Sequence, residues 1–129
     1  MTYTLDKTLS GSSFDAAVER TKAALARKDF GILTEIDVKA TMKKKLNADI
    51  DNYLILGACN PSMAFEAINM EPKGGAMLPC NVIVRSLGGG DIMISAIDPV
   101  ASMRAIENAA LKQVAGNVRA KLEQVIASI

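Results

Sequence analysis

The chain contains no histidine and no tryptophan, and only five of its 129 residues are aromatic. Without histidine it cannot form a Ser-His-Asp or Cys-His catalytic group, a histidine metal ligand or a histidine proton relay. Any general acid or base must therefore be Asp, Glu, Lys, Cys or Tyr. The scattered aromatic residues also argue against a platform on which bases or sugars stack.

Excess charge of either sign is also missing. The chain has 15 basic and 14 acidic residues, which gives a net charge of +1. A nucleic-acid-binding domain usually shows a clear basic excess, so we expect no nucleic-acid partner. Lys43-Lys44-Lys45 is the only dense basic run, and it is most simply interpreted as the solvated face of a helix.

Long apolar runs are absent as well. No segment approaches the roughly 18 apolar residues that a membrane span needs, and residues 1–14 lack the basic and apolar pattern of a signal peptide. We therefore expect no membrane association and a cytoplasmic location. In that reducing compartment the two cysteines are expected to be free thiols rather than a structural disulfide.

The composition is that of a globular protein, with 50% hydrophobic and 22% charged residues. A chain of this length can bury a substantial core. No internal repeat, linker or low-complexity segment divides it. We therefore expect one domain over residues 1–129.

Hydrophobic spacing predicts strands alternating with helices. Strands are expected over residues 2–8, 32–36, 53–58, 76–84 and 92–97, with Gly88-Gly89-Gly90-Asp91 as a hairpin turn before the last. Because Pro79 falls inside the fourth strand, an edge or a bulge is expected there. Helices are expected after Ser12, over 38–47, from Pro61 to about Met70, after Pro99, and along the stripe Leu111, Val114, Val118, Leu122, Val125 and Ile129.

Four capping residues mark where these helices begin. Ser12 with Asp15 fits a capping box, and Asp37 can cap the short basic helix. Asn60-Pro61 and Asp98-Pro99 each place a capping side chain before a proline at the first helical position. The resulting order of elements predicts an α+β fold with one sheet. Strands joined by helices suggest some parallel neighbours, whereas the hairpin requires one antiparallel pair.

A Cys-Asn step occurs twice, in the runs LGACNP and LPCNV, and these contain the only cysteines, Cys59 and Cys80. Such a polar step does not help a strand to pack, so its repetition suggests a shared site. Cys59 precedes the predicted helix cap Asn60, where the helix dipole could favour a thiolate. The alternative is that both cysteines are small hydrophobic residues of the core.

Asn60 can either cap its helix or donate its amide to a bound oxyanion. Asn81 has no capping role if it lies within a strand, where asparagine is depleted. Glu35 and Asp37 are two residues apart and so share one face of their strand. They are candidate site carboxylates, although a solvent-facing position for Glu35 and a helix cap for Asp37 are the simpler interpretations.

The chain resembles a bacterial and archaeal family known as domain of unknown function 302. The resemblance spans nearly the whole chain and rests on GILTEIDVKATMKKKL, YLILGACNPSMAFEAI, MLPCNVIV and the Asp98-Pro99 step. It implies a fold like that of the TATA-box-binding protein, with a curved, largely antiparallel sheet forming a half-barrel and helices packed on one side. It also implies a homodimer. It implies no reaction, and the fold does not bring DNA binding with it.

Within this resemblance Cys59, Asn60, Pro61, Cys80 and Asn81 carry the family motif, and Glu35, Asp37 and Lys39 lie in the TEIDVK motif. The chain departs from the pattern at Phe65, where many members carry a histidine.

The leading hypothesis is a protein that binds a small molecule or anion at a site lined by Cys59, Asn60, Cys80 and Asn81, with Glu35 and Asp37 as further candidates. The alternative is a thiol-based redox or sulfur-handling enzyme, with Cys59 as nucleophile and Cys80 as resolving thiol. One chain offers too few thiolates for a tetrahedral metal site, so a metal or cluster would need sulfurs from two subunits. A scaffold with both cysteines in its core is the remaining possibility.

Overall fold

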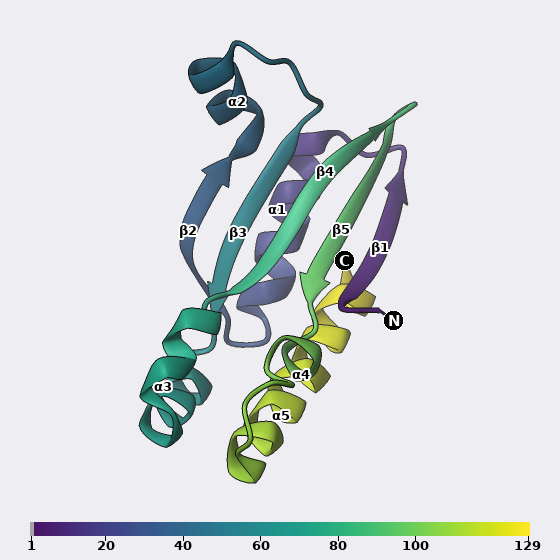
Figure 1. Cartoon of the computed structure of the whole chain (residues 1–129). Coiled ribbons are helices and arrows are strands. Elements are labelled where there is room, and N and C mark those ends of the chain that lie inside the picture. The colour runs from purple at the N-terminus through teal and green to yellow at the C-terminus, as the bar shows by residue number, and fades with distance from the viewer. Residues whose placement is uncertain (1) are drawn as a thin grey trace.

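The computed structural model describes residues 2–129, which form a single sheet with helices packed against it (Figure 1). The elements in chain order are β1 (Thr4–Ser10), α1 (Phe14–Ala26), β2 (Gly31–Asp37), α2 (Val38–Leu46), β3 (Tyr53–Cys59), α3 (Pro61–Met70), the 3-10 helix η1 (Pro72–Met77), β4 (Cys80–Gly88), β5 (Asp91–Ile97), α4 (Pro99–Ser102) and α5 (Ala109–Ser128).

The sheet has the strand order β1-β5-β4-β3-β2, and every neighbouring pair is antiparallel. The edge strands β1 and β2 do not pair with each other, so the sheet is open rather than closed into a barrel. These features confirm the expected α+β fold with a largely antiparallel sheet.

The suggestion of parallel neighbours is wrong, and the connecting helices show why. Parallel neighbours need a crossover helix that packs across a face of the sheet. The helix α2, which joins β2 to β3, has no buried residue, and α3, which leads from β3 towards β4, buries only Ala67. Neither helix crosses the sheet, so each connection returns the chain to an adjacent, antiparallel strand.

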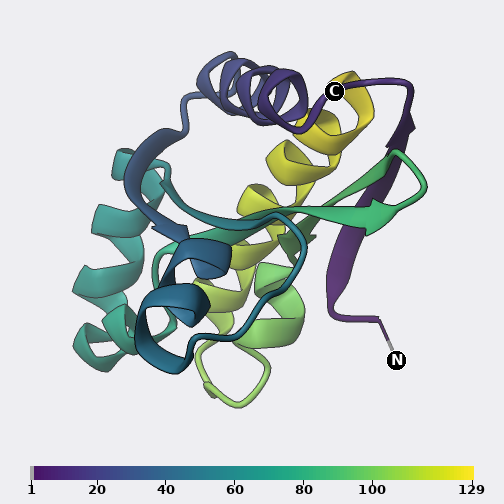
Figure 2. The same ribbon diagram turned by 90° about the horizontal axis from the view of Figure 1, so that it is seen from above.

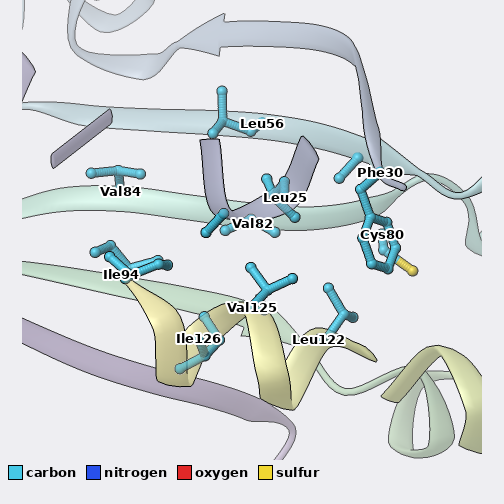
Figure 3. Close-up of a cluster of buried hydrophobic side chains, with 14 of the residues drawn as sticks. Leu25, Phe30, Leu56, Cys80, Val82, Val84, Ile94, Leu122, Val125 and Ile126 are labelled. Carbon is cyan, nitrogen blue, oxygen red and sulfur yellow. The ribbon is translucent and has the colours of Figure 1, made fainter. Parts of the chain in front are cut away.

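The hydrophobic core lies between the sheet and the helices α1 and α5. Seen from above, α1 and the C-terminal end of α5 lie side by side on one side of the sheet (Figure 2). Alternate residues of the central strands, including Leu56, Val82, Val84 and Ile94, point into this core (Figure 3). The six-residue stripe predicted along the last helix is buried as expected.

Three of the four predicted caps are confirmed. The side chains of Asp37, Asn60 and Asp98 accept backbone N–H groups at the start of α2, α3 and α4. The Ser12 cap is wrong by one residue, because the Oγ atom of Ser13 accepts the N–H of Ala16 at 3.1 Å. The Oγ atom of Ser12 instead accepts a hydrogen bond from the Arg20 guanidinium at 3.3 Å.

The predicted strand over residues 76–84 is also wrong at its start. Residues up to Met77 belong to η1, and β4 begins at Cys80, immediately after a cis Leu78–Pro79 peptide bond. Pro79 therefore precedes the strand, where its missing N–H costs no ladder hydrogen bond. The expected irregularity of the sheet lies elsewhere, between Ile32 and Thr34 and between Ser86 and Gly88.

Within residues 2–129, the helices are all too short or too polar to cross a membrane.

Candidate functional site

Cys59 and Cys80 lie at the same end of the sheet. Cys80, the first residue of β4, pairs with Ala58, the residue before Cys59 at the end of β3. Cys80 is buried and Cys59 is half-buried, and both are free thiols. Together with Asn60 they line a small cavity beneath α3 and α5. The structure therefore brings together three of the six predicted site residues.

Both thiols are held in the protonated form. Burial raises the pKa of the Cys59 thiol above its ordinary value. Burial also raises the pKa of Cys80, to about 11, with a further contribution from the neighbouring Cys59 charge. The expected lowering of the Cys59 pKa by the α3 dipole does not prevail, because desolvation disfavours the charged thiolate.

Asn60 serves as a helix cap. Its Oδ1 atom accepts the N–H of Met63 at 3.3 Å, and the side chain is almost fully buried. The capping interpretation of this residue is therefore confirmed. The side-chain NH2 group of Asn60 is not engaged by this bond, and Asn60 is one of the residues that line the cavity beside Cys59 and Cys80.

Asn81 lies on the other face of the sheet. Side chains alternate along a strand, so Asn81 points away from the core into which Cys80 and Val82 point. We call this second face, opposite α1 and α5, the open face. The side chain of Asn81 makes no hydrogen bond within residues 2–129. It is therefore available to a ligand, but not to one that also contacts the buried thiol of Cys80.

Glu35 and Asp37 lie on the edge strand β2 and are both engaged in structural contacts. Glu35 Oε2 forms an ion pair with Lys22 Nζ of α1 at 3.1 Å. Asp37 Oδ1 accepts the N–H of Ala40 at 2.9 Å as the cap of α2. Glu35 is therefore a solvent-facing strand residue and Asp37 a helix cap, as the simpler interpretations expect. Neither carboxylate lines the cavity of the cysteines.

The open face contains a hollow of about 570 Å³ that the sequence motifs did not reveal. Its floor is formed by outward-facing residues of β4 and β5, and its sides by residues of β1 and β3. The residues most important for its chemistry are Asp6, Tyr53, Asn81, Ile83, Arg85 and Ser95.

Arg85 is the functional candidate that sequence reasoning missed. It follows Asn81 and Ile83 at a spacing of two in β4, so all three share the open face. This spacing in the run NVIVR was the available signal. Its guanidinium donates to Met93 Sδ at 3.6 Å, and it forms no ion pair with any carboxylate of residues 2–129.

The Asn81 end of the open face is closed by tight packing at Gly57, which pairs with Asn81. A Cβ atom at Gly57 would overlap the Oγ1 atom of Thr34 and would lie 2.8 Å from Cγ of Pro79. Only glycine therefore fits between Thr34 and Pro79. Pro79 therefore packs here against β3.

Histidine, cysteine, aspartate and glutamate side chains of residues 2–129 form no group of three or more that could hold a metal ion. With the two cysteines alone at the cavity, a tetrahedral zinc site or an iron–sulfur cluster would lack ligands from this chain.

Comparison with known proteins agrees with this description of the fold. A family model for a domain of unknown function, DUF302, matches residues 5–129. The crystal structure of an uncharacterized conserved protein DUF302 from Bacillus stearothermophilus is similar over 99% of this chain and 98% of that chain, with a TM-score of 0.90 and 23% identity. No curated protein matches the chain. Because the family model covers almost its whole length, the chain belongs to the DUF302 family.

Proposed function

We propose that the protein binds a small organic molecule with one anionic group in the hollow of the open face. The observation that carries this proposal is Arg85, a guanidinium group in a concave surface whose only hydrogen bond within residues 2–129 is to the thioether of Met93 and which forms no ion pair there. A guanidinium is always charged and presents a fork of donors that matches a carboxylate or phosphate. A bound anion would give Arg85 the negatively charged partner that residues 2–129 do not provide.

Two further polar groups lie near Arg85. Asn81 is four residues away on the same strand, which places its Cα about 13 Å from that of Arg85. Ser95 is opposite Ile83, midway between them, and its hydroxyl makes no hydrogen bond within residues 2–129. Guanidinium, hydroxyl and amide therefore follow one line along β4 and β5. A ligand with its acid at Arg85 could reach polar contacts at both other groups.

The size and charge of the hollow limit the ligand further. Its volume of about 570 Å³ lies within the roughly 300–1,000 Å³ typical of small-molecule sites. The carboxylate of Asp6 borders the β1 side, where a second negative charge on the ligand would be repelled. Tyr53 provides an aromatic wall on the β3 side. These features favour an aromatic or partly apolar molecule with a single acidic group.

The other predicted binding residues contribute less to this site. Asn60, Glu35 and Asp37 already have structural partners, and Cys59 and Cys80 line a cavity whose open space is only about 30 Å³. An organic ligand does not fit there. Among the Cys/Asn motif residues, we therefore assign ligand contact to Asn81 alone.

Thermal unfolding with benzoate, 4-hydroxybenzoate and inorganic phosphate as separate probes tests the proposal. A probe that binds the folded state raises the unfolding temperature. We expect stabilisation by at least one of the two aromatic carboxylates, and a loss of its affinity of about ten- to a hundredfold in Arg85→Gln, because a charge-assisted hydrogen bond is lost.

Arg27→Gln is the matched control for this experiment. Arg27 follows α1 and does not line the hollow, but its replacement removes the same positive charge. Equal loss of affinity in both variants would mean a non-specific charge effect and would contradict the proposal. So would unchanged affinity in Arg85→Gln, or stabilisation by none of the three probes.

The thiol-based enzyme with Cys59 and Cys80 is the second candidate. The repeated Cys-Asn motif and the shared cavity favour it, whereas the raised pKa of both thiols disfavours it. Slow alkylation of Cys59 at pH 7 under native conditions would exclude it, because a nucleophilic cysteine needs a thiolate.

We further propose that the protein is a cytoplasmic homodimer, as the family resemblance implies. Two free thiols suit a reducing compartment. The net charge of +1 gives two copies little reason to repel each other. We assign the dimer contact to the exposed apolar side chains of α3 and η1.

A further inference from the structure

The hollow of the open face contains two charged side chains of opposite sign. Among the described residues that line it, only Asp6 of β1 and Arg85 of β4 are charged. Within residues 2–129 they form no ion pair with each other or with any other side chain. One concave surface of the described chain therefore presents an anion and a cation that have no charged partner.

The register of the sheet keeps these two residues apart. The strands β1, β5 and β4 lie side by side in this order (Figure 1). Asp6 is opposite Ser95 of β5, and Ser95 is opposite Ile83 of β4, two residues before Arg85. Two strand spacings across the sheet and two residues along β4 place the Cα atoms of Asp6 and Arg85 about 12 Å apart. A molecule that contacts both charges must therefore reach from β1 to β4.

Both charged groups can form further hydrogen bonds. Thr4 Oγ1 donates to Asp6 Oδ2 at 3.2 Å, and Asp6 Oδ1 accepts no hydrogen bond within residues 2–129. The guanidinium of Arg85 uses only one of its several N–H donors among the described residues, to Met93 Sδ at 3.6 Å. A cationic donor at Asp6 and an anionic acceptor at Arg85 would therefore each find an available partner.

From this arrangement we propose that the ligand of the open face is zwitterionic, with a carboxylate bound by Arg85 and a primary ammonium group bound by Asp6. The inference rests on the proposed function, to which it adds the cationic end of the ligand. An ammonium group is a compact cation with donors only, which suits a carboxylate that already accepts from Thr4. Like charges brought together at a binding surface are costly, so Asp6 disfavours a diacid and Arg85 disfavours a simple amine.

The side chains around the two charges indicate what joins the charged groups of the ligand. Ile83 is opposite Ser95, and Met93 is opposite Arg85, and both apolar side chains are half-buried in the hollow. Tyr53 is opposite Arg85 on β3 and lines the hollow beside it. Covering such apolar surface is favourable. The proposed ligand class is therefore an amino acid whose carboxylate and ammonium groups are separated by an apolar or aromatic body.

Isothermal titration calorimetry at low ionic strength with two shape-matched probes, 4-(aminomethyl)benzoate and 4-ethylbenzoate, tests the proposal. The probes differ only in an ammonium group that replaces a methyl group. We expect the wild type to bind 4-(aminomethyl)benzoate about three- to tenfold more tightly, between the effect of an exposed ion pair and that of a charge-assisted hydrogen bond. Asp6→Asn should abolish this preference without weakening the binding of 4-ethylbenzoate, because only the ammonium group contacts Asp6.

Asp29→Asn is the matched control and should keep the wild-type preference, since Asp29 is exposed between α1 and β2 and does not line the hollow. Equal affinity of the wild type for both probes would overturn the zwitterionic ligand while leaving Arg85 as an anion site. So would a preference that persists in Asp6→Asn or that disappears equally in Asp29→Asn. Failure of both probes to bind, or unchanged affinity for 4-ethylbenzoate in Arg85→Gln, would instead overturn the proposed function and this inference with it.

Discussion

At the scale of single residues, the environment of Cys80 makes a clear prediction about pH. Burial, and then the Cys59 charge, raise the pKa of this thiol from 9.0 to about 11 in the folded protein. The folded state therefore prefers the protonated thiol. This preference contributes stability that is complete below pH 9 and is lost as the pH rises towards 11.

Urea unfolding between pH 8 and pH 10.5 checks this expectation. The wild-type free energy of unfolding should fall across this range more steeply than that of Cys80→Ala, by on the order of 2 kcal/mol at most. Cys80→Ala is the control for lysines and tyrosines, because these residues are the same in both proteins. Parallel pH profiles would show that the thiol titrates alike in both states, and the buried position of Cys80 would then be wrong.

The candidate residues could be predicted from the sequence only where their roles are local. Asp37, Asn60 and Asp98 were recognised as helix caps because capping depends on the three residues that follow. The face on which Asn81 lies could not be predicted, because it depends on where β4 begins after Pro79. Arg85 was missed because its importance comes from a hollow made by residues of four strands.

At the scale of elements, the start of α1 distinguishes two neighbouring serines. Ser13 accepts the N–H of Ala16, whereas Ser12 is bonded only to the flexible Arg20 side chain. Loss of an N-cap costs about 1 kcal/mol, so Ser13→Ala should lower the free energy of unfolding by that amount. Ser12→Ala should change it by less than about 0.5 kcal/mol. Chemical denaturation of both variants makes the comparison, and equal effects would contradict the observed cap.

The elements themselves were largely predictable because their signals are periodic. The stripe along α5 and the alternation in β4 and β5 match the observed burial. The sheet topology was not predictable from such signals. A strand followed by a helix and another strand can be a parallel crossover or, as for β2-α2-β3, an antiparallel return around a projecting helix.

At the scale of the whole molecule, α3 and η1 carry a group of exposed apolar side chains. On α3 and η1 the side chains of Phe65, Ile68, Met70 and Met77 are exposed, and Phe65 is 69% exposed. Phe65 and Ile68 are three residues apart and so share one face of the helix. An exposed apolar patch of this kind marks an interaction surface. We expect this surface to form the contact of the proposed homodimer.

Light scattering coupled to size-exclusion chromatography should therefore give twice the chain mass of 13.7 kDa for the wild type. Phe65→Glu should give the monomer mass, because a desolvated carboxylate at the centre of the contact has no partner. Leu46→Glu on α2 is the matched control, since Leu46 is equally exposed but lies outside the patch. A wild-type monomer, or a dimer that persists in Phe65→Glu, would show that α3 does not form the contact.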